Sequence, residues 1–417
     1  MGRDVVSTEA IQRLNGIDID CQIHWHDARP DYSQWSTECR MEQAVVVGLR
    51  YMQSYLRPQV IITQGVSFED SSFSQGVRSV TQKFGIPHIA LPGPSKDLLW
   101  LSSLEAWNDI HIEVLLQVPP KSSGSVIRLI RSLEEADYLG SIPSLSIELP
   151  RQVDPQLLRF LQEIKWPPQS SSKVTLRRYI QPHPMNSAEA SLKTIEAFYP
   201  RDPNMSHVLM LAPQTELSPS FYHYLKYTIL RYKYSKFTER EPLRLFGISL
   251  ELPSTFPNNE EPFTPPHSDT SIVAHNEEPL PLFLWQAPNS NATLYFGDKW
   301  VELHSFLSNR LAVQEAVPLP SPQEKTFSRR YPAVMEYILE LMRTKGYYLL
   351  YPGFLGRESA LATVHSELYQ LSEEFSQDDP SKLTKPEING HSFKQHAIDS
   401  AAYLGTIEKS LSRASTS

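Results

Sequence analysis

Two side chains able to bind a ligand, Gln214 and Glu216, lie in a short polar turn. The turn follows an apolar run, residues 207–211, which is short and bounded by Pro213, as expected for a strand. Ligands in α/β folds bind beyond the carboxyl ends of strands. The turn is therefore the first candidate binding site.

A helix is predicted directly after this turn. Ser218 and Pro219 are typical of an N-cap and a first helical residue. Apolar side chains then recur every three or four positions through residues 219–232, which predicts an amphipathic helix with an aromatic buried face. The turn thus lies between a strand and a helix, and both would hold its side chains in place.

A second polar cluster, HWHD at residues 24–27, invites a metal interpretation. Two histidines two positions apart, with no third partner, more often belong to a polar loop or strand. We therefore favour the polar loop or strand.

Composition excludes several classes of function. The 417 residues include 39 basic and 47 acidic side chains, a net charge of -8, and provide no basic field for nucleic acid. Cys21 and Cys39 are too few for a disulfide framework or a cysteine metal site, and their spacing leaves open whether they pair. No run approaches the roughly 20 apolar residues of a membrane span, and the first residues lack a signal-peptide core. We expect a soluble chain without a nucleic-acid partner.

The elements around these residues alternate between strands and helices. A small first unit contains a helix at 41–56, strands at 60–63 and 87–91 that should pair in parallel, and a helix at 73–84, followed by a connecting helix at 95–108. The second series has strands at 110–118, 144–149, 174–180, 207–211, 244–250, 283–285, 293–296 and 347–351. Its helices fall at 122–136, 154–164, 188–198, 219–232, 298–310 and 329–345. The sequence predicts an N-terminal α/β segment at 1–105, a larger α/β domain at 106–371 and a polar tail at 372–417.

A proline- and acid-rich loop at 253–281 is long enough to be a lid over a site. The helix at 154–164 should begin with Asp154 as its N-cap and Pro155 at its first position.

Several strings in this second series carry a family resemblance: SGSVIRLIRSLEEADYLGSIPSLSIELP, LRRYIQPHPMNSAEASLKTIEAFYP, LMLAPQTELSPSFYHYLKYTILRY, LFGISLEL, APNSNATLYFGDKWVELHSFL and MEYILELMRTKGYYLLYPGF. In this order, over residues 63–375, the chain resembles fungal and plant glycosyltransferase 2-like proteins. It is also similar, more distantly, to N-acetylglucosaminyltransferase I of the Golgi. The resemblance implies a GT-A (Rossmann-like) fold and a nucleotide-sugar donor, with UDP-sugar the first choice. It also implies inverting transfer to a hydroxyl of a glycan, glycoprotein or glycolipid, often with a divalent metal.

Donor-binding residues follow from matching positions. Val118, Pro119 and Glu148 would face the nucleoside. Arg177 and Arg178 match a basic pair that could meet the diphosphate, since a guanidinium fork suits phosphate oxygens. An equally good interpretation is that the two arginines are solvated charges at a strand end.

The metal site of the family is altered in this chain. Ala212, Pro213 and Gln214 stand where plant relatives carry Glu-Asp-Asp, and Mg²⁺ or Mn²⁺ prefers carboxylate oxygens. Glu216 and His365 are the residues left to hold an ion, so we expect either no metal or a weak one.

Four further residues have a functional and a structural interpretation. Glu336 and Glu340 lie one helical turn apart where an inverting enzyme could place its general base, although such acids more often form a solvated helix face. Trp285 and Trp300 could stack on a sugar, although buried packing is the commoner role.

Two functions from different classes remain open. One is an active transferase; the other is a catalytically inactive relative that acts as a binding or scaffold protein, which the lost acidic cluster favours.

The sequence also predicts where the protein is located. Sequons at Asn204 and Asn291, together with the family resemblance, predict a location in the lumen of the Golgi or secretory pathway, with any membrane anchor in a segment absent from this chain.

Overall fold

The structure is a computed structural model that describes residues 12–13, 37–64, 69–91, 103–104, 106–120, 122–150, 153–166, 174–178, 187–235, 244–256, 262–266, 282–316, 332–353 and 360–365. The HWHD cluster at 24–27, most of the connecting helix predicted at 95–108, Cys21 and the tail from 372 lie outside these residues. Cys39 is exposed with a free thiol. No helix in these ranges is long and apolar enough to cross a membrane.

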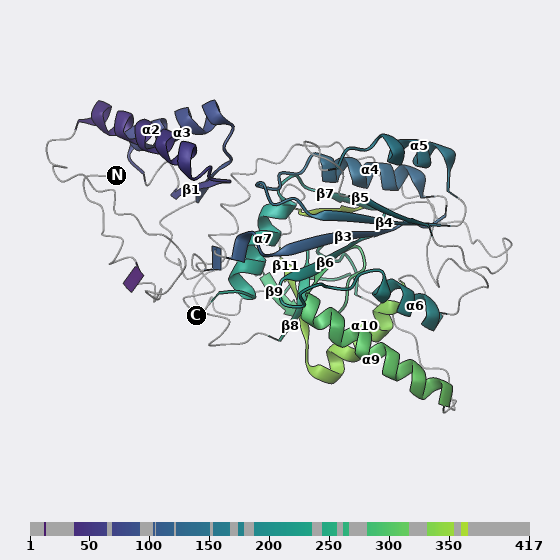
Figure 1. Ribbon diagram of the computed structural model, residues 1–417. Coiled ribbons are helices and arrows are strands. Elements are labelled where there is room, and N and C mark those ends of the chain that lie inside the picture. Colours follow the sequence, from purple (N-terminus) through teal and green to yellow (C-terminus); the bar gives the residue numbers. More distant parts are fainter. Residues whose placement is uncertain are drawn as a thin grey trace.

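An eight-stranded mixed sheet forms the centre of the larger domain (Figure 1). Its strand order is β5-β4-β3-β6-β10-β8-β11-β9. The strands are β3 (His111–Gln117), β4 (Ser144–Leu149), β5 (Val174–Arg178), β6 (Ser206–Leu211), β8 (Leu245–Ser249), β9 (Leu282–Trp285), β10 (Ala292–Tyr295) and β11 (Tyr348–Pro352). The prediction of an α/β domain is confirmed, and each of these strands overlaps a predicted one.

The direction of the strands divides the sheet into two halves. β5, β4, β3 and β6 are parallel to one another. β10 runs antiparallel to both β6 and β8, so β8 again points the same way as β6; β11 is parallel to β8 and β9 antiparallel to β11. The chain leaves β3 toward β4 on one side and later returns to add β6 on the other. The strand order therefore reverses between β3 and β6.

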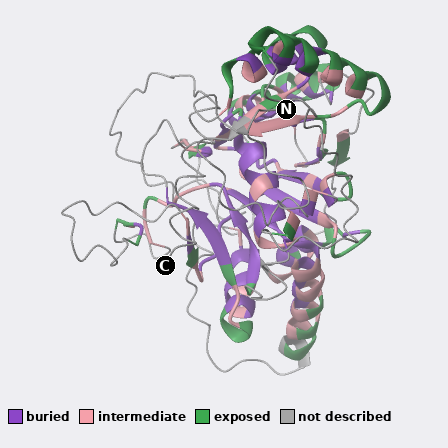
Figure 2. Ribbon diagram, turned by 90° about the vertical axis from the view of Figure 1, so that its left-hand side faces the viewer, coloured by how far each residue is buried: buried purple, intermediate pink, exposed green. Residues whose placement is uncertain are grey.

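Helices cover both faces of the sheet. In Figure 1, α4 (Ser123–Glu134) and α5 (Pro155–Glu163) lie above the strands, and α6 (Ser187–Glu196), α9 (Gly297–Ala316) and α10 (Val334–Lys345) lie below. Side chains alternate accordingly: Val114 and Leu116 pack with α4, whereas Leu115 packs with α6 and α9. Both faces are buried, as expected when crossover helices flank a parallel sheet (Figure 2).

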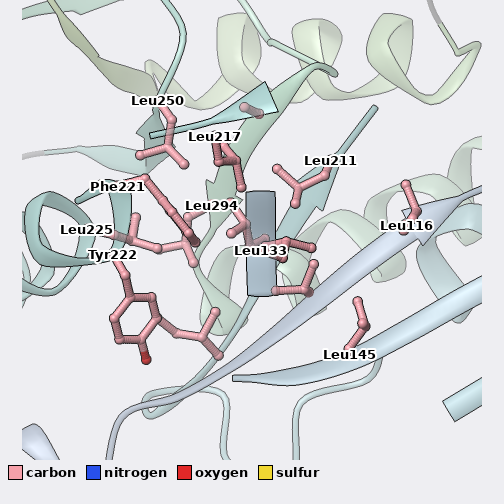
Figure 3. Close-up of a cluster of buried hydrophobic side chains, with 14 of the residues drawn as sticks. Leu116, Leu133, Leu145, Leu211, Leu217, Phe221, Tyr222, Leu225, Leu250 and Leu294 are labelled. Atoms are coloured by element: carbon pink, nitrogen blue, oxygen red, sulfur yellow. The ribbon is translucent and has the colours of Figure 1, made fainter. Parts of the chain in front are cut away.

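The core above the sheet also takes in α7 (Phe221–Tyr232), as Figure 3 shows for Phe221, Tyr222 and Leu225. This helix begins later than predicted. Its N-cap is Ser220, not Ser218, and Pro219 precedes the helix. The Ser218 hydroxyl instead accepts a hydrogen bond from the Ser220 amide at 3.3 Å. The predicted N-cap of α5 is confirmed, since the Asp154 carboxylate accepts a hydrogen bond from the Gln156 amide and Pro155 is the first helical residue.

A short two-stranded ribbon was not predicted. β7 (Thr215–Leu217) lies inside the polar turn and pairs antiparallel with β12 (Ala362–Val364), near the end of the described residues. Three residues are too few to show a period, so the ribbon has no signature in the sequence.

The small N-terminal unit has the predicted order: α2 (Glu38–Tyr55), β1 (Ile61–Gln64), α3 (Ser71–Phe84) and β2 (His88–Leu91). The two strands pair in parallel, as predicted. Met41 and Val45 of α2 are buried against Val77 of α3. Gly76 permits this close packing, because a Cβ atom there would lie 3.0 Å from Val45.

Candidate functional site

The carboxyl ends of the parallel strands meet at one edge of the eight-stranded sheet. β3, β4, β5 and β6 end at this edge, and so do β8 and β11 on the far side of β10. Because β10 is antiparallel, residues 289–291 just before it lie at the same edge. The edge includes the reversal of strand order between β3 and β6, the position where open α/β sheets bind ligands.

Glu251, Asn289 and Asn291 form a hydrogen-bonded cluster at this edge. The amide nitrogens of Asn289 and Asn291 both donate to Oε2 of Glu251, at 2.9 and 2.8 Å. Asn289 also donates to the Ser249 hydroxyl at 3.2 Å, and its own Oδ1 accepts from the Asn291 backbone at 2.7 Å. We call Glu251, Asn289 and Asn291, together with Gln214, the amide–carboxylate cluster.

The carboxyl group of Glu251 is partly buried at the carboxyl edge of the sheet. Burial raises its pKa, while the hydrogen bonds from Asn289 and Asn291 act in the opposite direction. Both amides use Oε2, and Oε1 has no hydrogen-bond partner in the part of the chain that the structure describes. One oxygen is thus held in place while the other is available as an acceptor.

Asn291 connects this cluster to the polar turn after β6. Its Oδ1 accepts from the Gln214 side chain at 3.3 Å, and its backbone carbonyl accepts from the Ala212 amide at 2.8 Å and the Thr215 hydroxyl at 2.9 Å. The Gln214 Oε1 atom is buried and unpartnered within the described residues. A buried amide oxygen without a donor costs about 1–3 kcal/mol, so a ligand that donates to it would gain this amount.

Glu216 and His365 are brought together by the ribbon. Glu216 of β7 is paired with Thr363 of β12, and the His365 amide donates to the Gln214 carbonyl at 3.0 Å. His365 Nε2 then lies 2.6 Å from Glu216 Oε2. The side chain of His365 is 37% exposed and that of Glu216 is 23% exposed, so a ligand can reach both.

This pair does not fit the metal site implied by the family resemblance. Glu216 and His365 are hydrogen-bonded to each other through Oε2 and Nε2, which takes one possible ligand atom of each side chain away from an ion. Within the described residues no three His, Cys, Asp or Glu side chains are grouped to hold a metal. Mg²⁺ takes octahedral oxygen ligation and retains several waters, so two mutually bonded ligands make a poor site.

The residues predicted to face the nucleoside lie along the other half of the edge. Val118 is buried and its amide donates to the Glu148 carbonyl at 2.9 Å, while the Pro119 carbonyl accepts from the Ser122 hydroxyl at 2.7 Å. The Glu148 carboxylate accepts from the Gln117 amide at 3.1 Å. These residues are adjacent, but no hydrogen bond joins them to the amide–carboxylate cluster within the described residues.

Arg177 and Arg178 end the edge strand β5. Arg177 is exposed, and its guanidinium donates to the carbonyl of Ala197, just after α6. The side chain of Arg178 lies outside the description. Binding of a diphosphate by this pair stays a prediction.

The two acids predicted on α10 differ in their surroundings. Glu340 forms an ion pair with Arg310 of α9, with 3.1 Å between Nε and Oε1. Its charge is therefore already compensated. Glu336 lies in the first turn of α10 and is partly buried, and its role as a base stays a prediction.

Both tryptophans are packed against protein. Trp300 is fully buried, and its indole donates to the carbonyls of Ile195 and Phe198, each at 3.0 Å. Trp285 stacks on Phe263 with ring centroids 4.5 Å apart. Phe263 belongs to the described base of the 253–281 loop, where Thr255 and Pro262 form a bridge. The loop is thus anchored to the sheet by an aromatic stack, next to Glu251.

Sequence reasoning missed Glu251, Asn289 and Asn291. The strings SLEL at 249–252 and NSN at 289–291 put polar side chains at strand ends. Their proximity depends on β10 being inserted antiparallel between β6 and β8, and strand pairing is not encoded in local periodicity.

Comparisons with known proteins find two family models. Residues 1–108 match the SPBC1E8.03c N-terminal domain and residues 124–316 match the SPBC1E8.03c C-terminal domain. No curated protein matches the chain significantly. Neither family description names an activity, so the chain is similar, segment by segment, to the two domain families described for SPBC1E8.03c.

Proposed function

We propose that the chain binds a nucleotide sugar, with UDP-sugar the first choice, and transfers the sugar to a hydroxyl group of a glycan, glycoprotein or glycolipid. The observation that carries the proposal is the amide–carboxylate cluster beside the Glu216–His365 pair at the carboxyl edge of the sheet. The reaction type comes from the family resemblance. The side chains that would bind the sugar come from the geometry of the carboxyl edge.

The architecture is compatible with a GT-A fold. Four parallel strands form the half that would hold the nucleoside, and the strand order reverses between β3 and β6. In the other half β10 and β9 run antiparallel to the rest, and β10, inserted between β6 and β8, brings Asn289 and Asn291 to the carboxyl edge. α4 begins five residues after Val118, and a helix N-terminus favours the negative charge of a phosphate.

The chemistry of the cluster suits a sugar. Hydroxyl groups both donate and accept hydrogen bonds, and the cluster offers amide donors with carboxylate and amide acceptors. Glu251 Oε1 and Gln214 Oε1 are the acceptors without a partner in the described chain. We assign these two atoms to the recognition of sugar hydroxyls.

A catalytically inactive binding or scaffold protein is the second candidate function. The replacement of the family's acidic turn by Ala212, Pro213 and Gln214 favours it. The two candidates share the donor site and differ in turnover, so a chain that binds UDP-sugar without ever releasing UDP supports the scaffold.

Thermal unfolding in the presence of a panel of nucleotide sugars tests the shared donor site. A donor at 100 times its dissociation constant stabilises by about 2.7 kcal/mol. We expect Glu251→Gln to reduce the stabilisation, and Glu163→Gln, an exposed change on α5, to leave it intact. If no nucleotide sugar raises the unfolding temperature of the unmodified chain, the proposal is wrong.

A further inference from the structure

The Glu216–His365 pair disagrees with the metal role implied by the family resemblance, and its geometry suits another role. A carboxylate oxygen 2.6 Å from an imidazole nitrogen can only accept when it is ionised. His365 Nε2 must then carry the proton. The carboxylate fixes the neutral ring in the Nε2–H tautomer, which leaves a lone pair on Nδ1.

We propose that Glu216 and His365 form a proton-transfer pair in which His365 is the general base and Glu216 is its positioning residue. His365 Nδ1 has no hydrogen-bond partner in the described part of the chain, and the side chain is 37% exposed. A base oriented through its second nitrogen by a carboxylate is the arrangement used to activate hydroxyl nucleophiles.

The position of the pair matches this task. The His365 amide is bonded to the Gln214 carbonyl, and the Gln214 side chain is bonded to Asn291 of the amide–carboxylate cluster. The base is therefore joined by two hydrogen bonds to the groups assigned to the sugar. The ribbon of β7 and β12 fixes both members of the pair on neighbouring strands.

The proton transfer is part of the sugar transfer given as the proposed function. The oxygen of an acceptor hydroxyl forms a bond with the anomeric carbon of the donor. The bond between that carbon and the phosphate oxygen breaks, and its electron pair leaves with the nucleoside diphosphate. The hydroxyl proton passes to Nδ1 of His365, and the imidazolium is stabilised by the Glu216 carboxylate.

Variants at the two residues separate a base from a structural contact. His365→Gln can still donate to Glu216 through an amide placed like Nε2 but offers no basic nitrogen. We expect it to lower kcat for sugar transfer, or for donor hydrolysis with water as acceptor, by about 100-fold or more with little change in KM. Glu216→Gln should lower kcat less, and Glu251→Gln should mainly raise KM. A kcat of His365→Gln within threefold of the unmodified chain would overturn the proposal.

A spectroscopic measurement checks the pair without turnover. In the full chain with ¹⁵N-labelled histidine, the signals that disappear in His365→Gln should show a protonated Nε2 and an unprotonated Nδ1. They should not broaden when Mn²⁺ is added. An Nδ1–H tautomer, or broadening by Mn²⁺, refutes the proposal in favour of a different role for the pair.

Failure of the pair and failure of the donor site give different results. Calorimetry with UDP reports donor binding alone. If UDP does not bind, both proposals fall; if UDP binds and no UDP-sugar is turned over with any acceptor or with water, donor binding stands and the proton-transfer pair is wrong.

Discussion

Arg177 was predicted to bind a diphosphate, but its side chain forms a hydrogen bond within the protein. Its guanidinium donates to the Ala197 carbonyl, which ties the edge strand β5 to the chain just after α6. We therefore expect Arg177→Ala to lower the unfolding free energy by about 1 kcal/mol and to leave UDP affinity unchanged. Differential scanning calorimetry and UDP titration of the same sample measure the two effects.

Arg178 carries the remaining expectation for the diphosphate. Loss of a charge-assisted bond to phosphate costs roughly 1.5–3 kcal/mol, or about tenfold to a hundredfold in affinity. Arg178→Ala should therefore weaken UDP binding by that factor, with Arg177→Ala as its matched control. Equal UDP affinities in both variants and the unmodified chain would mean that neither arginine binds the diphosphate.

Lys226 is a buried cation that forms no ion pair with a carboxylate of the described residues. It is fully buried on α7, and its ammonium donates to the Trp107 carbonyl at 2.8 Å. Burial lowers its pKa to about 8, whereas the unfolded chain keeps the ordinary value near 10.5. Between these values the unfolded state binds more protons than the folded state, so the contribution of Lys226 to stability rises with pH.

Lys226→Met should remove this dependence. The increase in unfolding free energy between pH 8 and pH 10 that Lys226 contributes should be about 2 kcal/mol, and it should be missing in the variant. Denaturant titrations of both proteins at the two pH values provide the comparison. Identical slopes would mean that Lys226 keeps its proton in the folded chain.

Metal dependence tests Glu216 and His365, the two residues that would hold an ion. Since Glu216 and His365 are bonded to each other and the turn after β6 provides no other acid, UDP-sugar affinity should be nearly equal in EDTA and in millimolar Mn²⁺. Titration under both conditions measures this. A gain of tenfold or more with Mn²⁺ that vanishes in Glu216→Ala would establish a metal-dependent site instead.

At the level of elements, the sequence predicts those that are long enough to show a period. α5 was predicted with its N-cap, and β4 with both its ends, because Asp154-Pro155 and the alternation of polar and apolar residues in SLSIEL are local signals. The start of α7 was misplaced because Ser218-Pro219 resembles a helix start, whereas the Ser218 hydroxyl is used in a turn. β7 and β12 were not predicted, because their pairing joins segments that are remote in sequence.

Two glycines in helices give opposite predictions for the same substitution. A Cβ at Gly76 would meet Val45 at 3.0 Å and the Glu42 carbonyl at 3.1 Å, whereas a Cβ at Gly124 meets nothing within 4 Å. Gly124→Ala should stabilise the domain by about 0.4–1 kcal/mol. Gly76→Ala should loosen α2 against α3 and speed hydrogen exchange of their amides. Slower exchange in Gly76→Ala would show that Val45 can move aside.

At the level of the whole molecule, the two sequons are not equivalent. Asn204 is exposed in a turn before β6, whereas the Asn291 amide donates to Glu251 and Thr293 is fully buried. The folded domain therefore accommodates a glycan at Asn204 alone. If the chain is produced through the secretory pathway, mass spectrometry should find a glycan on Asn204, and Asn204→Gln should remove it. A glycan on Asn291 of folded protein would contradict the position of the cluster.

The fold class and the carboxyl edge of the first four strands could be predicted because parallel α/β units follow from alternation. The candidate site could be predicted only in part. Gln214, Glu216 and His365 were found through a strand end and a family resemblance. Glu251, Asn289 and Asn291 meet only because an antiparallel strand inserts between two parallel ones, and that choice is made by the packing of the whole sheet.

The ribbon between β7 and β12 also bears on biosynthesis. Every strand of the central sheet precedes residue 353, whereas the segment that brings His365 to Glu216 comes later in the chain. During translation the sheet can assemble before this segment leaves the ribosome. The newborn domain would then have its central sheet but lack the Glu216–His365 pair, and premature termination after residue 353 would produce a folded protein without the proton-transfer pair that we propose. Because β12 is the last strand of the described residues, the proposed pair would form only after the sheet that surrounds it.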